Sequence, residues 1–204
     1  MPSLTVTGIL ATLVLLAPHA VAPTPAEGLP RELVALRESL QRTKKMSARF
    51  TQTRHLAALH GALTTEGTLE YENGGRLVWR TLPPAESELV LDGQQVTMSY
   101  PGMGGAQTIN FSADPGMGRV FETIRAVLQA DLEQLEPLFT FVVGRKDPLS
   151  LSLSPRTPEL ARTLRSIQLD FDRRFRLVHV GLTEPDGDST EISFRDHVIQ
   201  TSAH

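Results

Sequence analysis

Short runs of alternating apolar and polar residues, separated by tight-turn dipeptides, restrict the fold of this chain more than any other feature. The runs begin at Ser47 with SARFTQTRHL and continue through TTEGTLEYE, GRLVWRT and SELVLDG. Because successive side chains of a β-strand point to opposite faces, this period of two predicts strands with one apolar face. The dipeptides Asp92-Gly93 and Asp186-Gly187 are typical of hairpin turns. The pattern therefore predicts a meander of antiparallel strands.

Two segments depart from this period. Residues 29–45 follow Pro30 with Leu33, Leu36 and Leu40 at helical spacing, which predicts an amphipathic helix. In the middle of the chain, MGRVFETIRAVLQADLEQLEPLF carries an apolar stripe that predicts one long or two short helices. The expected order is a helix, about five strands, the helical segment and about six strands.

The fold class that follows is mainly β (α+β), with a single large antiparallel sheet and helices on one face. A sheet of about ten strands has to curl, so the helices are expected to cover its concave face. No repeat or linker divides the chain. We therefore expect one domain over residues 27–204.

Residues 1–26 contain no Asp, Glu, Lys or Arg, and the segment Ile9 to Leu16 is almost wholly apolar. That apolar run is too short to cross a bilayer, which takes about 20 residues, but it fits a secretory signal peptide. Cleavage is expected after Ala22 or Ala26, and the alternative is an uncleaved N-terminal anchor. With no cysteine, the chain cannot be a lipoprotein anchored through an N-terminal Cys. We expect a soluble periplasmic protein.

The composition excludes some partners. A formal net charge of −3 and the lack of any long basic run argue against nucleic acid and against a polybasic membrane anchor.

Motifs for catalysis or metal binding are weak. The spacing of His55 and His60 matches no zinc motif, and the GMGG segment joins two expected strands rather than a strand and a helix. The pair Asp186 and Asp188 resembles part of a calcium loop but lacks its other ligands, so a turn is the better interpretation. We expect no enzyme activity, no cofactor and no metal.

One expected strand also carries acidic residues. Asp170 and Asp172 alternate with Ile167, Leu169 and Phe171, which makes them solvated strand positions. What remains is an apolar sheet face with a helical cover, and two alternatives stay open. The helices either pack on the sheet as a solid core, or leave space for a hydrophobic guest.

The stretch from Phe50 to Val96 resembles the outer-membrane lipoprotein carrier family (LolA-like). The resemblance lies in F-x-Q on a strand after the first helix, G-x-φ-x-φ, then a basic residue and Trp on one strand, Pro, and Asp-Gly before the next strand. The matching positions are Phe50, Gln52, Gly67, Leu69, Tyr71, Arg76, Trp79, Pro83, Pro84, Asp92 and Gly93. LTEPDGDSTEISFRDH is similar to the last hairpin of the family.

The resemblance implies a half-open β-barrel with a helical lid over a hydrophobic cavity that holds acyl chains. Two departures mark a divergent branch. An Arg that ties sheet to lid in the family corresponds to Asn73 here, so this latch is absent or has moved to Arg76. Aromatic residues make up only 5% of the chain, whereas the family's interior is rich in them.

Alternation places Leu77 and Trp79 on one strand face, with Arg80 on the opposite, wet face. We expect the first face to line the cavity, and the alternative is that Trp79 is ordinary core packing. The expected cavity residues are Phe50, Leu69, Leu77, Trp79, Leu89, Leu91, Met98, Phe139, Phe141, Ile167, Leu169 and Phe171. The expected lid residues are Phe121, Ile124, Leu128 and Leu135.

These expectations describe a monomeric periplasmic carrier that shuttles a lipoprotein or another envelope lipid towards the outer membrane. Its partners would be the lipid cargo, an inner-membrane donor protein and an outer-membrane acceptor protein. The alternative is a lipid-sensing or regulatory envelope module of the same fold that does not transport.

Overall fold

The computed structural model describes residues 30–58, 61–93, 95–101, 106–110, 126 and 132–202. Within this part of the chain lie three helices and eleven strands. The helices are α1 (Arg31–Gln41), α3 (Leu132–Leu135) and α4 (Pro158–Ala161). The strands are β1 (Thr43–His55), β2 (Ala62–Glu72), β3 (Arg76–Thr81), β4 (Ser87–Asp92), β5 (Gln95–Ser99), β6 (Ala106–Asn110), β7 (Phe139–Lys146), β8 (Leu149–Pro155), β9 (Ser166–Phe171), β10 (Leu177–Thr183) and β11 (Ser189–Thr201).

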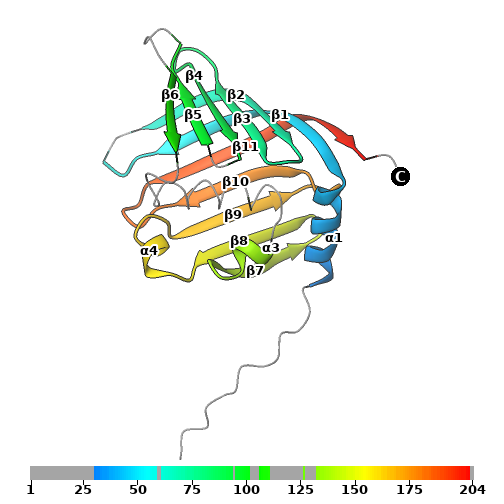
Figure 1. Cartoon of the computed structure of the whole chain (residues 1–204). Coiled ribbons are helices and arrows are strands. Elements are labelled where there is room, and N and C mark those ends of the chain that lie inside the picture. The colour runs from blue at the N-terminus through cyan, green and yellow to red at the C-terminus, as the bar shows by residue number, and fades with distance from the viewer. Residues whose placement is uncertain are drawn as a thin grey trace, which may run out of the picture.

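All eleven strands form one antiparallel sheet in the order β6-β5-β4-β3-β2-β1-β11-β10-β9-β8-β7, and the sheet is not closed (Figure 1). The first and last strands lie side by side at its centre, with Phe50 opposite Phe194. The expectation of one large antiparallel sheet is confirmed. The count differs from the expectation, since six strands precede the middle segment and five follow it.

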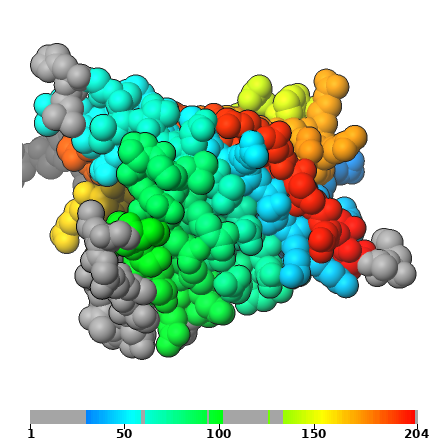
Figure 2. All heavy atoms as spheres, turned by 90° about the horizontal axis from the view of Figure 1, so that it is seen from above, coloured from blue at the N-terminus to red at the C-terminus, as the bar shows by residue number. Residues whose placement is uncertain are grey.

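The two central strands bend near one end. Their register shifts between Ser47 and Arg49, and Asp196 on β11 has a φ of 56°, which is typical of a bulge. A hydrogen bond of 2.8 Å between His197 Nε2 and the carbonyl of Leu177 ties this bend to β10. The C-terminal part of β11 runs as a ridge beside β1 (Figure 2).

The first helix is shorter than expected. It follows Pro30 but ends at Gln41, whereas the periodicity predicted a helix over residues 29–45. The prediction was wrong for Thr43 and Lys45, because these residues pair with β11 and β2 and so satisfy their backbone groups in the sheet. No helix in the described part of the chain is long and apolar enough to span a membrane.

One face of the sheet carries the core and is called the inner face here; the other is the outer face. Strand β9 shows the alternation clearly, since Ile167, Leu169 and Phe171 are buried and the residues between them are half-buried. Leu33 and Leu36 of α1 and Leu135 of α3 pack into the same buried cluster. Helices α1 and α3 therefore cover part of the inner face, on the side that the sequence predicts.

Candidate functional site

The candidate site is the inner face, because it gathers apolar side chains from most strands of the sheet. Among the predicted cavity residues, the buried ones are Phe50, Leu69, Leu77, Leu91, Phe139, Ile167, Leu169 and Phe171. The partly buried residues packed against them are Trp79, Leu89 and Phe141. Met98 lies opposite Leu89 on β5 and is half-buried, but it is not part of the cluster. Whether these residues contact lipid stays a prediction.

The predicted lid residues are only partly described. Leu135 is 2% exposed and belongs to the core cluster. Phe121, Ile124 and Leu128 lie outside the described residues.

Trp79, the only Trp of the chain, lies on the inner face in an aromatic group. Its ring stacks on Phe50, with centroids 3.9 Å apart and an angle of 27° between the planes. Phe194 of β11 meets it edge-on, with a centroid distance of 6.2 Å. Offset-stacked and edge-to-face pairs both suit the quadrupoles of the rings. The expected inner-face position of Trp79 agrees with this packing.

The missing side chain of Gly67 leaves room for the ring of Phe50. A Cβ atom built on Gly67 would lie 2.3 Å from Cζ of Phe50 and 2.0 Å from the backbone oxygen of Arg80. Only a residue without a side chain fits between the ring and strand β3. The glycine of the G-x-φ-x-φ pattern therefore has a packing role.

Sequence reasoning missed part of the inner face. The missed core residues include Tyr71, Val96, Leu149, Leu151, Leu153, Leu177, Ile192 and Phe194. The signal was present in LSLSLS and in STEISFRDHV, where apolar residues alternate with polar ones as clearly as on β9.

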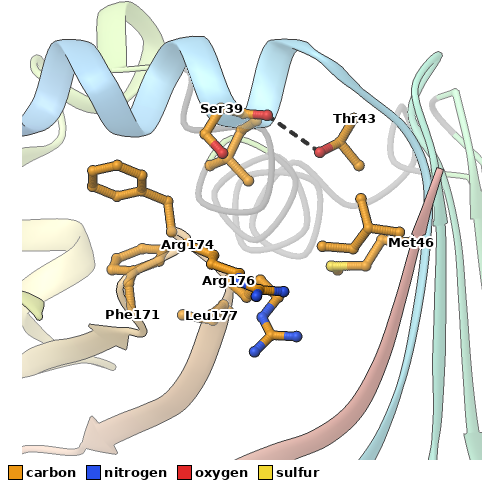
Figure 3. A pocket seen from close by; sticks show the side chains of 10 residues that line it. Ser39, Thr43, Met46, Phe171, Arg174, Arg176 and Leu177 are labelled. Carbon is orange, nitrogen blue, oxygen red and sulfur yellow. Dashed lines mark hydrogen bonds between the residues drawn. The ribbon is translucent and has the colours of Figure 1, made fainter. Parts of the chain in front are cut away.

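A small cavity opens at one end of the inner face, with a volume of about 30 Å³ (Figure 3). It lies between the C-terminal end of α1, the start of β1, the end of β11 and the turn between β9 and β10. The lining residues are Ser39, Leu40, Thr43, Met46, Phe171, Arg174, Phe175, Arg176, Leu177 and Ile199. We call this the rim cavity.

The outer face carries charged pairs between neighbouring strands. Arg80 bonds Glu88 and Glu70 on the two neighbouring strands, and these hydrogen bonds raise the pKa of its guanidinium. Its outer position agrees with the expected alternation. Arg76 lies on the same face beside Asp92, with a nitrogen–oxygen distance of 3.9 Å. The alternative that a lid latch moved to Arg76 is therefore wrong, because this side chain points away from the helices.

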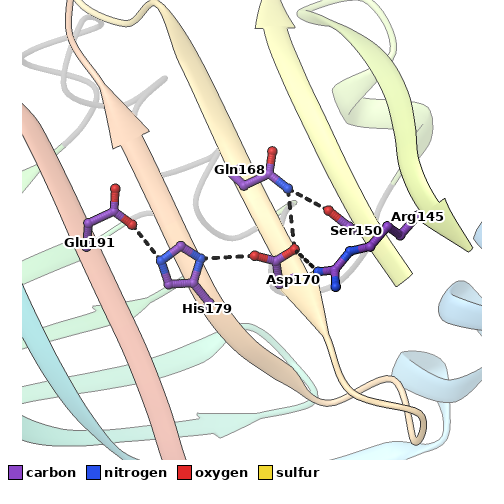
Figure 4. A network of polar contacts seen from close by, with 6 residues as sticks. All are labelled: Arg145, Ser150, Gln168, Asp170, His179 and Glu191. Carbon is purple, nitrogen blue, oxygen red and sulfur yellow. Dashed lines mark hydrogen bonds and ion pairs between the residues drawn. The ribbon is translucent and has the colours of Figure 1, made fainter. Parts of the chain in front are cut away.

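Asp170 is not simply a solvated strand residue, as its pattern predicted. His179 Nδ1 lies 3.2 Å from Asp170 Oδ2, and the other ring nitrogen of His179 lies 2.5 Å from Glu191 (Figure 4). Arg145 donates to Asp170 at 3.1 Å. Burial raises the pKa of Asp170, but hydrogen bonds lower it by more, so that the net shift is downward. Their donors are Ser150, Gln168, Arg145 and His179.

This network crosses from β7 to β11 on the outer face (Figure 4). The side chains of Asp170, His179 and Glu191 are 23%, 31% and 47% exposed. The network joins neighbouring strands on the face opposite the apolar cluster.

Asp172 also departs from the expected strand position. It lies just after β9, where its Oδ1 accepts the amides of Arg174 and Arg176, both at 2.9 Å. This carboxylate therefore organises the turn between β9 and β10.

The acidic turn before β11 contains the only group of three potential metal-ligating side chains found among the described residues: Glu184, Asp186 and Asp188. Protein partners account for their arrangement. Arg54 approaches Glu184 and Asp188 at 3.6 and 3.7 Å, and the amide of Ala57 donates to Asp188 at 2.8 Å. The interpretation as a hairpin turn fits these contacts.

The family comparison agrees with the fold. The family model described as "Outer membrane lipoprotein carrier protein LolA" matches residues 41–203. The chain therefore belongs to the family of outer membrane lipoprotein carrier proteins. Among curated protein sequences, none matches it.

Solved structures with a similar course of the chain have low sequence identity. A DUF1329 family protein from Desulfovibrio piger is 9% identical, covering 88% of this chain and 96% of that one, with a TM-score of 0.48. An outer membrane lipoprotein-sorting protein domain from Vibrio parahaemolyticus is 14% identical over 84% and 93%, with a TM-score of 0.44. The lipoprotein LppX from Mycobacterium tuberculosis is 9% identical over 81% and 94%, with a TM-score of 0.43. The family assignment rests on the sequence match.

Proposed function

We propose that this protein is a periplasmic carrier that binds acyl chains of a lipoprotein or another envelope lipid on the inner face. It then delivers them towards the outer membrane without catalysis. Membership of the lipoprotein carrier family is the observation that carries this proposal. The continuous apolar inner face supplies the physical reason.

The energetics favour acyl chains over polar cargo. Burial of each CH₂ group contributes about 0.8 kcal/mol, so even partial insertion of one chain gives substantial binding. With aromatic residues at 5% of the chain, the lining is mostly flexible aliphatic side chains. A lining of this kind adapts to different chains and releases them readily, which suits transfer between a donor and an acceptor.

The rim cavity alone is too small for an acyl chain, since it measures about 30 Å³ and ligand pockets are roughly 300–1,000 Å³. We therefore expect the helical cover to move when a chain is loaded. Helix α1 is suited to move as a unit, since it packs through Leu33 and Leu36 and has an exposed outer side. An ion pair of 3.2 Å between Glu32 and Lys146 links its first turn to the edge strand β7. In this proposal α1 and the predicted lid residues separate from the sheet as the chain enters.

The remaining parts of the proposal concern location and partners. Residues 1–26 act as an export signal, and the domain over residues 27–204 works as a monomer. An inner-membrane protein supplies the cargo and an outer-membrane protein accepts it. The competing function is a lipid-sensing module that binds cargo but does not exchange it.

Native mass spectrometry tests the carrier function. The full chain is expressed in a bacterial host, and the exported protein is purified without detergent. A discrete added mass that organic extraction removes is expected, and its fragments identify the cargo class. The loaded protein is then mixed with empty vesicles. Loss of the added mass supports a carrier, whereas a retained mass supports the sensing module. A clean unliganded mass, together with no uptake of an added fatty acid, would contradict both.

A further inference from the structure

The rim cavity joins an apolar interior to a cationic edge. Phe171 and Leu177 line it and also belong to the buried cluster, being 4% and 8% exposed. The cavity therefore borders the apolar cluster of the inner face. Met46 and Ile199 close it on the side of the central strands, where they lie opposite each other in the β1–β11 pair.

Its edge is formed by the turn between β9 and β10. Phe175 has a φ of 57°, a left-handed conformation that is rare for a residue with a side chain. The Asp172 carboxylate stabilises this conformation by accepting the amides on either side of Phe175. The turn thereby brings both Arg174 and Arg176 to the cavity (Figure 3).

The two arginines differ in their partners. Arg176 donates from Nε to Asp172 at 2.6 Å, so its charge is balanced within the turn. Burial raises the pKa of Asp172, but the hydrogen bonds from Arg176 and from the two amides lower it by more, and the carboxylate stays ionised. The guanidinium of Arg174 is exposed and has no hydrogen bond or ion pair with any described residue. One positive charge is therefore left over at the edge.

An unpaired guanidinium beside an apolar cavity matches one kind of ligand. Arginine binds phosphate and carboxylate groups through paired N–H donors. The C-terminal end of α1 also lines the cavity, and its carbonyl groups would favour a cation instead of an anion. One of them, the Ser39 carbonyl, already accepts a hydrogen bond from the Thr43 hydroxyl at 3.3 Å. Since the apolar lining leads from the charge to the inner face, the matching ligand is an anionic group attached to an acyl chain.

We propose that the rim cavity binds the anionic end of the lipid cargo, a phosphate or carboxylate, through Arg174. This inference rests on the proposed carrier function, and it narrows the cargo to acidic lipids. The acyl chain extends along the inner face past Phe171, while the charged group stays at the edge, near water.

The test compares two probes that differ only in the polar end. One is a brominated fatty acid and the other is the brominated fatty alcohol of the same length, both titrated at pH 8. Bromine quenches Trp fluorescence at short range, so Trp79 reports the entry of either chain. The wild-type protein is expected to bind the acid about tenfold more tightly than the alcohol, which corresponds to about 1.4 kcal/mol.

Arg174→Gln is the test variant, and Arg173→Gln is its matched control. Arg173 is the preceding residue, its side chain is 83% exposed and pairs with Asp147 at 3.5 Å, and it does not line the cavity. Arg174→Gln should lower the affinity for the acid about three- to tenfold and leave the affinity for the alcohol unchanged. Arg173→Gln should change neither, although it removes the same charge from the protein. Equal melting temperatures show that both variants are folded.

The outcomes separate this inference from the carrier function. If acid and alcohol bind equally and Arg174→Gln has no effect, the anionic-end site is refuted while the carrier stands. If neither probe quenches Trp79 and native mass spectrometry shows no bound probe, the carrier function fails, and the inference with it. A further arm adds millimolar inorganic phosphate: unchanged binding of the acid is expected. Displacement of the acid, with phosphate binding alone that Arg174→Gln abolishes, would identify a phosphate site and overturn the lipid assignment.

Discussion

Replacing Gly67 by Ala should destabilise the protein through a clash that neither neighbour can relieve. The added Cβ would lie 2.0 Å from the backbone oxygen of Arg80 and 2.3 Å from Cζ of Phe50, whereas real Cβ contacts essentially never fall below 3.0 Å. The Phe50 ring is fully buried and stacked on Trp79, so it cannot rotate away. The carbonyl of Arg80 is part of the β2–β3 ladder, so its movement would disturb the pairing of both strands.

The magnitude follows from two opposing effects. Overpacking costs about 1–3 kcal/mol, and a backbone contact belongs to the upper end of that range. A Gly→Ala change also lowers the entropy of the unfolded chain, which stabilises by about 0.4–1 kcal/mol. The expected net loss is about 2 kcal/mol. For a domain of this size, it corresponds to a fall in melting temperature of roughly 4–8 °C.

Urea unfolding followed by Trp79 fluorescence measures this loss, with a thermal melt as a second measurement. Gly144→Ala is the matched control, because Gly144 also lies in a strand and its added Cβ would meet nothing closer than 3.6 Å. The control should stay within about 0.5 kcal/mol of the wild type. If Gly67→Ala were as stable as Gly144→Ala, the packing explanation of this glycine would be refuted.

Three further predictions concern the cover and the outer face. Leu36→Ala should lower the free energy of unfolding by about 2–4 kcal/mol, because the side chain is 2% exposed in the core; a change below 1 kcal/mol in urea unfolding would contradict this packing. Arg80→Gln should cost less than about 1 kcal/mol, because its partners Glu70 and Glu88 are solvent-accessible; a larger loss in a thermal melt would show that these pairs hold the strands together. Asp170→Asn should reduce stability at pH 7 and progressively less as the pH falls from about 5 to 3. The lowered pKa of Asp170 means that the unfolded state binds the proton more tightly, so its contribution is present above the unfolded pKa of about 3.9 and lost as the pH falls through the folded pKa. Urea unfolding at several pH values measures the difference in free energy of unfolding between the wild type and Asp170→Asn. A difference that does not change with pH would contradict the assignment.

The strands were predictable because their pattern is local. The alternation on β9 and the Asp92-Gly93 and Asp186-Gly187 turns fix strand faces and hairpins within a few residues of each other. The end of α1 was not predictable in the same way. Thr43 and Lys45 continue a helical composition, but pairing with strands distant in the sequence decided their conformation.

Site residues were likewise predictable where local alternation located them, and not where long-range strand pairing did. The inner position of Trp79 followed from alternation alone. The outer network did not, because the contact between Asp170 and His179 depends on the register of β9 against β10. The rim cavity was also missed. It depends on Phe175, which adopts a left-handed conformation that a side chain normally disfavours and that Asp172 stabilises.

The most direct test of the central claim is the position of a bound acyl chain relative to the two faces of the sheet. The wild-type protein, with Trp79 on the inner face, is compared with a double variant Trp79→Phe, Val142→Trp, whose reporter stands at a position 56% exposed on β7. Both are titrated with a brominated and an unbrominated fatty alcohol. Binding on the inner face predicts that only the brominated chain quenches Trp79 and that the reporter at position 142 keeps its fluorescence. Quenching at position 142 with none at Trp79 would place the lipid on the outer face and contradict the account.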